Sequence, residues 1–288
     1  MATISSVAST HESGLKAFVK RNPLISMYAL LFLLGWPVQI LDALASHGLA
    51  PKPPTIFTIV TGLTPAIAAV IVTAVLTGRA GVKDLFRRFL IWRMGVQWYV
   101  VGLFLLAVVI LGGIGLHVLF GGTMPTIPIS GAPMGLIVFA FTVTVIVGAV
   151  INTEEIAWRG FALPRLQSRY GALTAALLIA VPESLFHLPH FWNLDSVFYQ
   201  NVGLFWFTAF TVAIVFIYTY IFNKTHGSLL IVTILHASQN AWANLLSDNT
   251  LRPFQFTVAL MWMIALALIF ITKGQLGYTS EQENLLSE

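Results

Sequence analysis

Eight long apolar runs dominate this sequence and limit what the chain can fold into. Each has roughly the 20 residues that an α-helix needs to cross the hydrocarbon core of a bilayer. The runs cover residues 24–45, 54–77, 97–120, 134–152, 172–191, 201–222, 228–246 and 255–272. Only 9% of the residues are charged, whereas a soluble domain carries about a quarter. We therefore predict an all-α polytopic membrane protein of about eight transmembrane helices, embedded in the lipid bilayer.

The basic residues are divided unequally between the two sides of this predicted membrane domain. If the N-terminus is cytoplasmic, only Lys52 and Arg252 fall on the outer side. The inner side holds thirteen, namely Lys16, Lys20, Arg21, Arg79, Lys83, Arg87, Arg88, Arg93, Arg159, Arg165, Arg169, Lys224 and Lys273. Because an excess of Lys and Arg marks the cytoplasmic side, we predict that both termini are cytoplasmic. In a bacterium the membrane would be the plasma membrane.

The expected organisation is one membrane domain at 24–272, with a cytoplasmic segment at 1–23 and a cytoplasmic tail at 273–288. The first 15 residues and the tail from Gly274 are expected to be disordered. Residues 82–94 mix arginines with apolar residues, which predicts an amphipathic helix in the interface or a basic connecting loop. The basic residues form no single patch, so no nucleic-acid partner is expected. The absence of cysteine excludes disulfides and thiolate metal sites.

Two adjacent glutamates lie at the end of the fourth predicted span. Glu155 and Arg159 are spaced i,i+4 with the acid first, which is the favourable order for an ion pair on a helix. Neighbouring residues diverge by about 100° around a helix, so Glu154 would point elsewhere and be free for chemistry. The simpler interpretation is an interfacial charge cluster that ends the helix.

Two further spans carry polar groups at helical spacing. Glu183, His187 and His190 recur at i, i+4 and i+7 near the end of the fifth span, which places them on one helical face. His236 and Asn240 share a face well inside the seventh span. Taken alone, the histidines of the fifth span also fit an interfacial position, and polar groups inside spans also tie helices together.

These groups would suit hydrolysis if the three spans meet at one polar cavity. A buried glutamate can act as a general base on water, histidines shuttle protons or bind metal, and an asparagine amide can stabilise an oxyanion. Glu154, His190 and His236 would also make a zinc site with one open position. The residues therefore leave glutamate chemistry, zinc chemistry and a transporter's proton relay open.

The three segments resemble the motifs of the CAAX-protease and bacteriocin-processing (CPBP) family of intramembrane proteases, which includes relatives of the CAAX prenyl endopeptidases. That family is marked by Glu-Glu-x-x-x-Arg, Phe-x-x-x-His and His-x-x-x-Asn or Asp. The matching residues are Glu154, Glu155 and Arg159, then Phe186 and His190, then His236 and Asn240. The resemblance covers roughly residues 80 to 250, where it places the protease core.

The resemblance implies an intramembrane endopeptidase that hydrolyses a membrane-associated or lipid-modified substrate, such as a prenylated CAAX protein. Glu154 would activate the water with help from His190. His236 and Asn240 would bind the oxyanion or act as further polar ligands. Members of the family are described either as metalloproteases or as glutamate-dependent proteases, so zinc is the one cofactor considered.

The remaining residues of these segments are expected to support the site. The resemblance implies a structural role for Glu155 and Arg159. Glu183 and His187 are additional to the family pattern, and we predict that Glu183 orients one of the histidines as a hydrogen-bond acceptor.

Other protease signatures are missing. The only His-Glu pair, His11 and Glu12, lacks the second histidine of a His-Glu-x-x-His zinc motif. There is no Gly-x-Ser-x-Gly and no pair of intramembrane aspartates, since Asp42 is the only aspartate within a predicted span. The alternatives are a non-catalytic scaffold or immunity-type protein of the same fold, and a proton-coupled transporter, although no repeated halves are visible.

The two glutamates and the histidines must also meet at one depth. At 1.5 Å rise per residue, His190 would lie near the outer face of the membrane and Glu154 near the inner one. We expect the fourth span to continue past Glu155 to about Pro164, which places the glutamates deeper; a bend at Pro182 is the alternative. The cavity is expected among the fourth to seventh spans, open to the cytoplasm.

Overall fold

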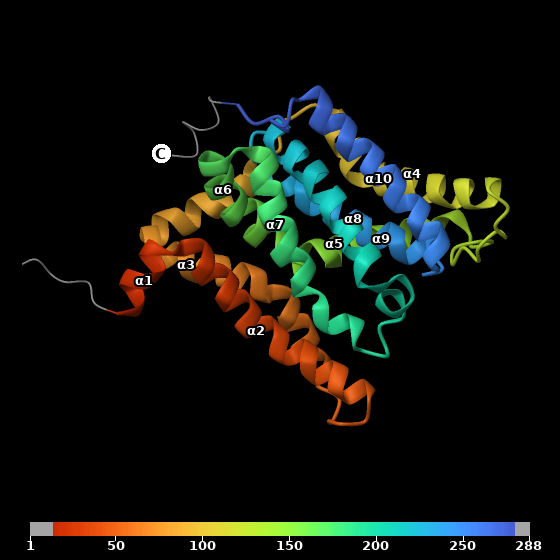
Figure 1. Cartoon of the computed structure of the whole chain (residues 1–288), viewed down its shortest axis with the longest axis horizontal. Helices are drawn as coiled ribbons and strands as arrows, with labels where there is room; N and C mark the ends of the chain where they lie inside the picture. The colour runs from red at the N-terminus through yellow and green to blue at the C-terminus, as the bar shows by residue number, and fades with distance from the viewer. Residues whose placement is uncertain (1–13, 280–288) are drawn as a thin grey trace, which may run out of the picture.

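The computed structural model describes residues 14–279, which form ten α-helices and three short helical segments with no strand among them (Figure 1). The elements are α1 (Leu15–Arg21), α2 (Pro23–Ser46), α3 (Thr55–Arg87), η1 (Arg88–Leu90), α4 (Val96–Leu119), α5 (Met134–Ile151), η2 (Ile156–Ala162), α6 (Leu163–Tyr170), α7 (Ala172–Phe186), η3 (Leu188–Phe191), α8 (Val197–Lys224), α9 (Leu229–Leu246) and α10 (Leu251–Ile271). The predicted all-α fold is confirmed. Residues 1–13 and 280–288 lie outside the described residues, and so does the disorder predicted for them.

Eight helices occupy the eight predicted spans, but only six of them in the described chain are long and apolar enough to cross a membrane. These six are Pro23–Ser46, Thr55–Leu90, Val96–Leu119, Met134–Ile151, Val197–Lys224 and Leu251–Ile271. Of the other two, α7 has only 15 residues, and α9 is interrupted by polar side chains. The membrane fold is thus confirmed, and the two helices that fall short are those that carry Glu183, His236 and Asn240.

A break at Gly78 explains the unusual length of α3. Its backbone (φ 68°, ψ −157°) joins two helical stretches in a region of conformation that is open essentially to glycine alone. The second stretch ends at Arg87 and is continued by η1 to Leu90. The helix predicted within 82–94 is therefore present up to Leu90, and it follows directly from the preceding span.

The fourth span ends at Ile151, where Asn152 is extended (φ −84°, ψ 101°), so the predicted continuous helix to about Pro164 is wrong, although helical structure resumes at Glu154. After Ile151 the chain passes through Glu154 and Glu155 into the π-helical segment η2 and then into α6, and it turns at Gly171 (φ 78°) before α7. All seven residues of η2 are buried. Segments with π-helical hydrogen bonding occur often at functional sites. This second helical stretch holds both glutamates in the interior of the molecule.

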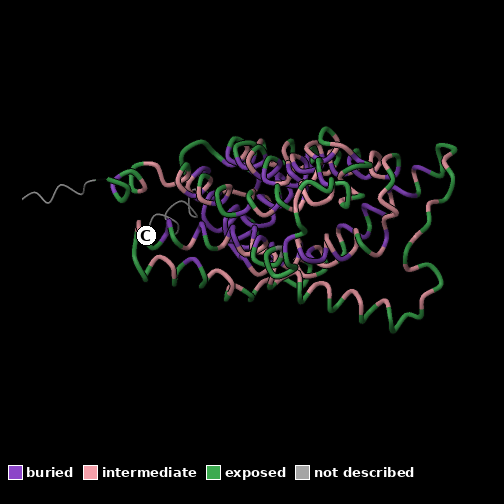
Figure 2. The backbone as a smooth tube through the Cα atoms, turned by 90° about the horizontal axis from the view of Figure 1, so that it is seen from below, coloured by how far each residue is buried: buried purple, intermediate pink, exposed green. Residues whose placement is uncertain are grey.

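The core lies around α8 and η2, and Figure 2 shows the buried residues gathered in the interior of the molecule. Trp158 and Phe161 of η2 and Phe222 of α8 are completely buried. By contrast, α5 has no buried residue, and large apolar side chains such as Phe139 and Phe270 are exposed. Such an apolar exterior is expected of helices that face lipid.

The start of the predicted disordered tail is in fact packed. Leu276 is completely buried, and its carbonyl oxygen accepts a hydrogen bond from the Asn223 side chain at 3.0 Å. The prediction of disorder from Gly274 onward is therefore wrong for residues 274–279. Leu276 is an isolated apolar residue in a polar segment, so no sequence periodicity signalled this contact.

Candidate active site

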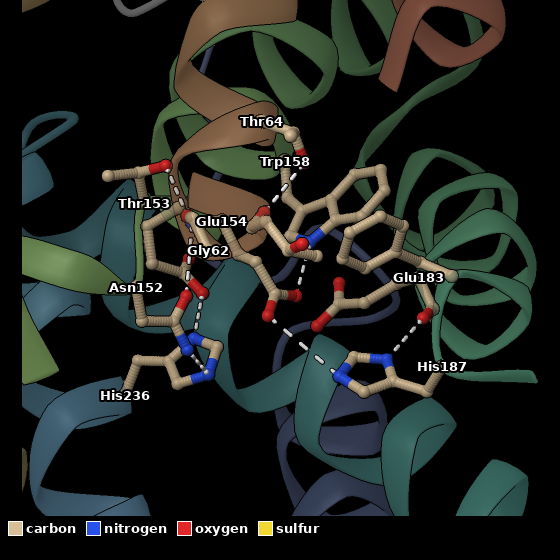
Figure 3. Close-up of polar contacts among 12 residues, drawn as sticks. Gly62, Thr64, Asn152, Thr153, Glu154, Trp158, Glu183, His187 and His236 are labelled. Carbon is tan, nitrogen blue, oxygen red and sulfur yellow. Dashed lines mark hydrogen bonds and ion pairs between the residues drawn. The ribbon is translucent and has the colours of Figure 1, made fainter. Parts of the chain in front are cut away.

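Glu154 lies at the junction of α5 and η2, and its carboxylate faces the end of α7 (Figure 3). Trp158 Nε1 donates a hydrogen bond to its Oε2 at 3.1 Å. Its Oε1 lies 3.8 Å from Nε2 of His187. Among the described residues no Lys or Arg forms an ion pair with Glu154, although its side chain is buried. The carboxylate is thus oriented by Trp158 and faces His187, without an ion pair to Lys or Arg.

Glu155 has a different environment, because it forms a buried charge network behind the cavity wall. Arg159 Nη1 lies 3.3 Å from Glu155 Oε1 and 3.0 Å from Glu183 Oε2. The guanidinium also stands 4.5 Å from the ring centre of Tyr218, within the range of a cation–π contact. The predicted Glu155–Arg159 pair is confirmed, and Glu183 is a second carboxylate on the same arginine.

His236 is held on both sides of its ring. Its Nδ1 lies 2.8 Å from Glu155 Oε1, so in the neutral ring Nδ1 is the donor and Nε2 the acceptor. The Asn152 amide donates to Nε2 at 2.9 Å. Asn152 is oriented for this because its Oδ1 accepts a hydrogen bond from the backbone N–H of Glu154 at 3.2 Å. Glu155 and Asn152 together therefore fix the tautomer and the direction of the His236 ring.

The two histidines of the fifth span have different surroundings. His187 caps α7, and its Nδ1 lies 3.0 Å from the carbonyl oxygen of Glu183, which leaves Nε2 directed toward Glu154. His190 is in η3 and stacks on the ring of Tyr199, with the ring centres 5.0 Å apart. The predicted contact of Glu183 with a histidine is therefore made by its backbone carbonyl, because its carboxylate binds Arg159.

One cavity of about 580 Å³ joins these groups. All four predicted catalytic residues line it, namely Glu154, His190, His236 and Asn240. The supporting residues Glu183, Phe186 and His187 also line it, whereas Glu155 and Arg159 lie behind its wall. The predicted convergence of three spans on one polar cavity is thus present, with walls from α2, α3, α4 and α10 as well.

The predicted opening of this cavity toward the cytoplasm does not agree with the predicted cytoplasmic termini. The cavity extends from Glu154 to Asp248 and Asn249 in the loop between α9 and α10, on the side of the bundle away from α1 and from the end of α10 (Figure 1). The two expectations cannot both hold. The extent of the cavity could not be predicted from the sequence, because it depends on where α5 and α7 end.

Asn152 and Trp158 are site residues that the motifs did not identify. Trp158 is four residues after Glu154, which places both on one helical face, so this contact was visible in the spacing. Asn152 has a weaker signal as a polar residue at the end of an apolar run. Tyr199 stands at the beginning of α8, far from any motif, and only the fold brings it to His190.

The zinc set proposed from the sequence does not fit these residues. Within residues 14–279 no three carboxylate, imidazole or thiol groups are arranged to hold a metal ion. His236 already uses Nδ1 for Glu155 and Nε2 for Asn152, so it has no ring nitrogen left for the set with Glu154 and His190. A metalloprotease site is therefore not supported, and no step below runs through a metal.

The fold and the cavity define an all-α polytopic membrane protein with a buried carboxylate–imidazole site. Residues 132–242 match the family described as type II CAAX prenyl endopeptidase Rce1-like. The chain is also similar to CAAX prenyl protease 2 of Methanococcus maripaludis, with 28% identity over 179 residues, which is 59% of this chain and 64% of that protein. The matched segment contains all three motifs, and the predicted resemblance to the CAAX-protease family is confirmed over it.

Proposed function

We propose that this protein is an intramembrane endopeptidase of the CAAX-protease type, in which Glu154 activates the attacking water. The observation that carries the proposal is the contrast between two adjacent glutamates. Glu155 is paired with Arg159 and His236, whereas Glu154 lines the cavity, accepts a hydrogen bond from the neutral Trp158 N–H and faces His187 at 3.8 Å. A buried carboxylate that faces an imidazole and forms no ion pair with Lys or Arg is suited to accept a proton.

The gap between Glu154 and His187 is suited to one water molecule. At 3.8 Å between Oε1 and Nε2, the pair is too far apart for a direct hydrogen bond, and a water can bridge such a separation. Glu154 would take a proton from this water while the oxygen of the water attacks the scissile carbonyl carbon. The same proton would then pass to the leaving amine as the C–N bond breaks, which regenerates the carboxylate.

The oxyanion of this reaction would lie toward α9. The Asn240 amide lines the cavity and can donate a hydrogen bond to the developing charge. His236 would act mainly by position, because both of its ring nitrogens are engaged. His187 is the imidazole nearest to Glu154, and His190 lies on the same wall beside Tyr199. We expect both His187→Ala and His190→Ala to lower kcat, with the larger loss identifying the histidine that contacts the water.

The cavity also indicates the kind of substrate. Its volume falls in the range of about 300 to 1,000 Å³ that holds small ligands, which is enough for a few residues of a peptide. The lining also includes aromatic side chains of α8, namely Phe198, Phe207 and Phe210. A membrane-associated or lipid-modified peptide would leave its apolar part among the helices and present one peptide bond to Glu154.

The decisive test is Glu154→Gln in the full chain purified in detergent, assayed on quenched peptides with and without a lipid group. We expect turnover to fall by roughly 10² to 10⁴ fold, the usual loss for a general base. Glutamine keeps an oxygen for Trp158, so the fold should persist. The matched control is Asp84→Asn, an exposed acid that contacts only Arg87, and it should leave turnover unchanged.

Three results would contradict this assignment or redirect it. Unchanged turnover in Glu154→Gln would refute the role of Glu154. A wild-type protein that cleaves none of a broad panel would favour a non-catalytic scaffold. Loss of turnover after chelation, restored by zinc, would show that zinc chemistry operates in spite of the poor fit of His236.

A further inference from the structure

On each helix, the residues that line the cavity lie toward the same end of the bundle. On α2 the lining residues are Val38, Gln39 and Asp42, near the C-terminal end, and on α10 they are Pro253, Phe254 and Thr257, near the N-terminal end. The C-terminal end of α2 and the N-terminal end of α10 lie on the same side of the bundle, because the two helices run in opposite directions (Figure 1). In Figure 1 the loop after α2 lies at the bottom, away from α1 and α6.

On α7 and α9, which carry the second and third motifs, the lining residues lie toward the same end of the bundle. On α7 the lining begins at Glu183, eleven residues after the helix starts, and on α9 it begins at His236, seven residues after the start. From His236 to Leu246 the helix rises about 15 Å at 1.5 Å per residue. The site thus forms the floor of a cavity that extends to the loop at Asp248 and Asn249.

The opposite end of the bundle is closed and basic. Trp158, Phe161 and Phe222 are completely buried between the site and the turns that precede α7 and α9. Of the thirteen basic residues assigned to that end, Arg159 is completely buried within the protein, which leaves twelve near that surface. The cavity end has Lys52 and Arg252, and Lys52 is paired with Asp195 at 3.0 Å.

We infer that the cavity opens on the face of the membrane opposite α1 and the end of α10, which the distribution of Lys and Arg makes the non-cytoplasmic face. The inference about the substrate rests on the proposed protease function: the scissile segment arrives from that face and belongs to an exported or membrane-anchored peptide. This replaces the cytoplasmic opening expected from the sequence. Twelve basic residues against two is a strong asymmetry, and the lining residues reach the loop after α9 at one end of the bundle.

The charge of the cavity agrees with such a substrate. No Lys or Arg of the described chain lines it, whereas four carboxylates do, namely Asp42, Glu154, Glu183 and Asp248. A free C-terminal carboxylate would find no Lys or Arg of the described chain in the lining, since Arg159 lies behind the wall between Glu155 and Glu183. The lining favours an internal peptide segment that is neutral or basic.

The chain contains no cysteine, so single cysteines can report the accessible side without altering native thiols. Asn244→Cys places a thiol at an exposed position of the cavity wall, and Ser168→Cys places one on the exposed surface of α6. In intact bacterial cells that express the full chain, a membrane-impermeant maleimide should label Asn244→Cys. It should label Ser168→Cys only after permeabilisation. Ser247→Cys, on the same cavity wall, replaces Asn244→Cys if that variant does not accumulate.

A fusion to the C-terminus gives a second readout. A fluorescent protein fused there should fluoresce, and an alkaline phosphatase fused there should be inactive, because the phosphatase requires export. Labelling of Ser168→Cys in intact cells, or of the cavity cysteines only after permeabilisation, would overturn the inference. Neither measurement depends on turnover. A reversed pattern would leave the protease proposal standing, and a failed Glu154→Gln test would leave the topology standing.

Discussion

Arg159 is the residue whose removal should most damage the fold, and Arg159→Met tests this directly. Its side chain is completely buried. Nη1 lies within 3.3 Å of carboxylate oxygens of both Glu155 and Glu183. Methionine has a similar length and no charge, so the substitution leaves two buried carboxylates without their shared cation and leaves little empty space.

The expected loss follows from this geometry. Removing one partner of a buried ion pair costs about 3–5 kcal/mol, because the remaining charge is uncompensated. The contact of the guanidinium with the Tyr218 ring is lost as well. The lower bound of about 3 kcal/mol corresponds to roughly a 10²-fold change in the folding equilibrium. Adding Glu183→Gln should recover part of the loss, since it neutralises one of the two orphaned carboxylates.

The measurement is the free energy of unfolding in mixed micelles, followed by the fluorescence of the eight tryptophans. The matched control is Arg169→Met, because Arg169 is exposed and contacts the Tyr170 ring at 5.3 Å. It should lose about 1 kcal/mol or less. A loss below about 1 kcal/mol in Arg159→Met would refute the reasoning, since a buried pair should cost more. So would a double variant no more stable than the single one.

Three further predictions concern helix packing, the His236 ring and the substrate. Gly62→Ala should destabilise the fold by about 1–3 kcal/mol, because the added Cβ would lie 2.8 Å from the carbonyl oxygen of Ile151. The control is Gly115→Ala, whose added Cβ meets nothing within 4 Å and should not destabilise the fold. Asn152→Ala should lower kcat by roughly tenfold or more, since it frees Nε2 of His236. The free energy of unfolding should fall by only about 1 kcal/mol, and an unchanged kcat would contradict this prediction. Peptides with Lys beside the scissile bond should be cleaved faster than the same peptides with Glu, and Asp42→Asn should reduce the difference because it removes a carboxylate from the cavity wall.

Much of the fold could be predicted because hydrophobic length and charge are local properties of the sequence. Eight helices, α2 to α5 and α7 to α10, lie where the apolar runs are, whereas α6 falls between two runs and the break at Asn152 was not predicted. What could not be predicted are features set by tertiary contacts. The π-helical segment η2, the break at Gly78 and the packing of Leu276 have no periodic signal.

The site was predictable to a similar degree. Motif spacing identified Glu154, His190, His236 and Asn240, and one cavity is lined by all four. The spacing could not decide whether His187 or His190 approaches Glu154, because the helix ends at Phe186 and the ring directions change beyond it. It could not show that Asn152 occupies Nε2 of His236 either, since residues 152 and 236 meet only through the packing of α5 on α9.

The same polar groups explain both the site and the two helices that do not qualify as independent spans. An ionisable side chain inside a bilayer is tolerated where it faces protein or a water-filled cavity. Glu183 on α7 and His236 on α9 meet this condition, because they line one cavity and bind Arg159 and Glu155. The six apolar helices supply the contact with lipid, so α7 and α9 are free to carry the groups that hydrolysis requires. Replacing Glu183 by leucine should therefore make α7 more apolar and the protein less stable, because Arg159 would lose a buried partner.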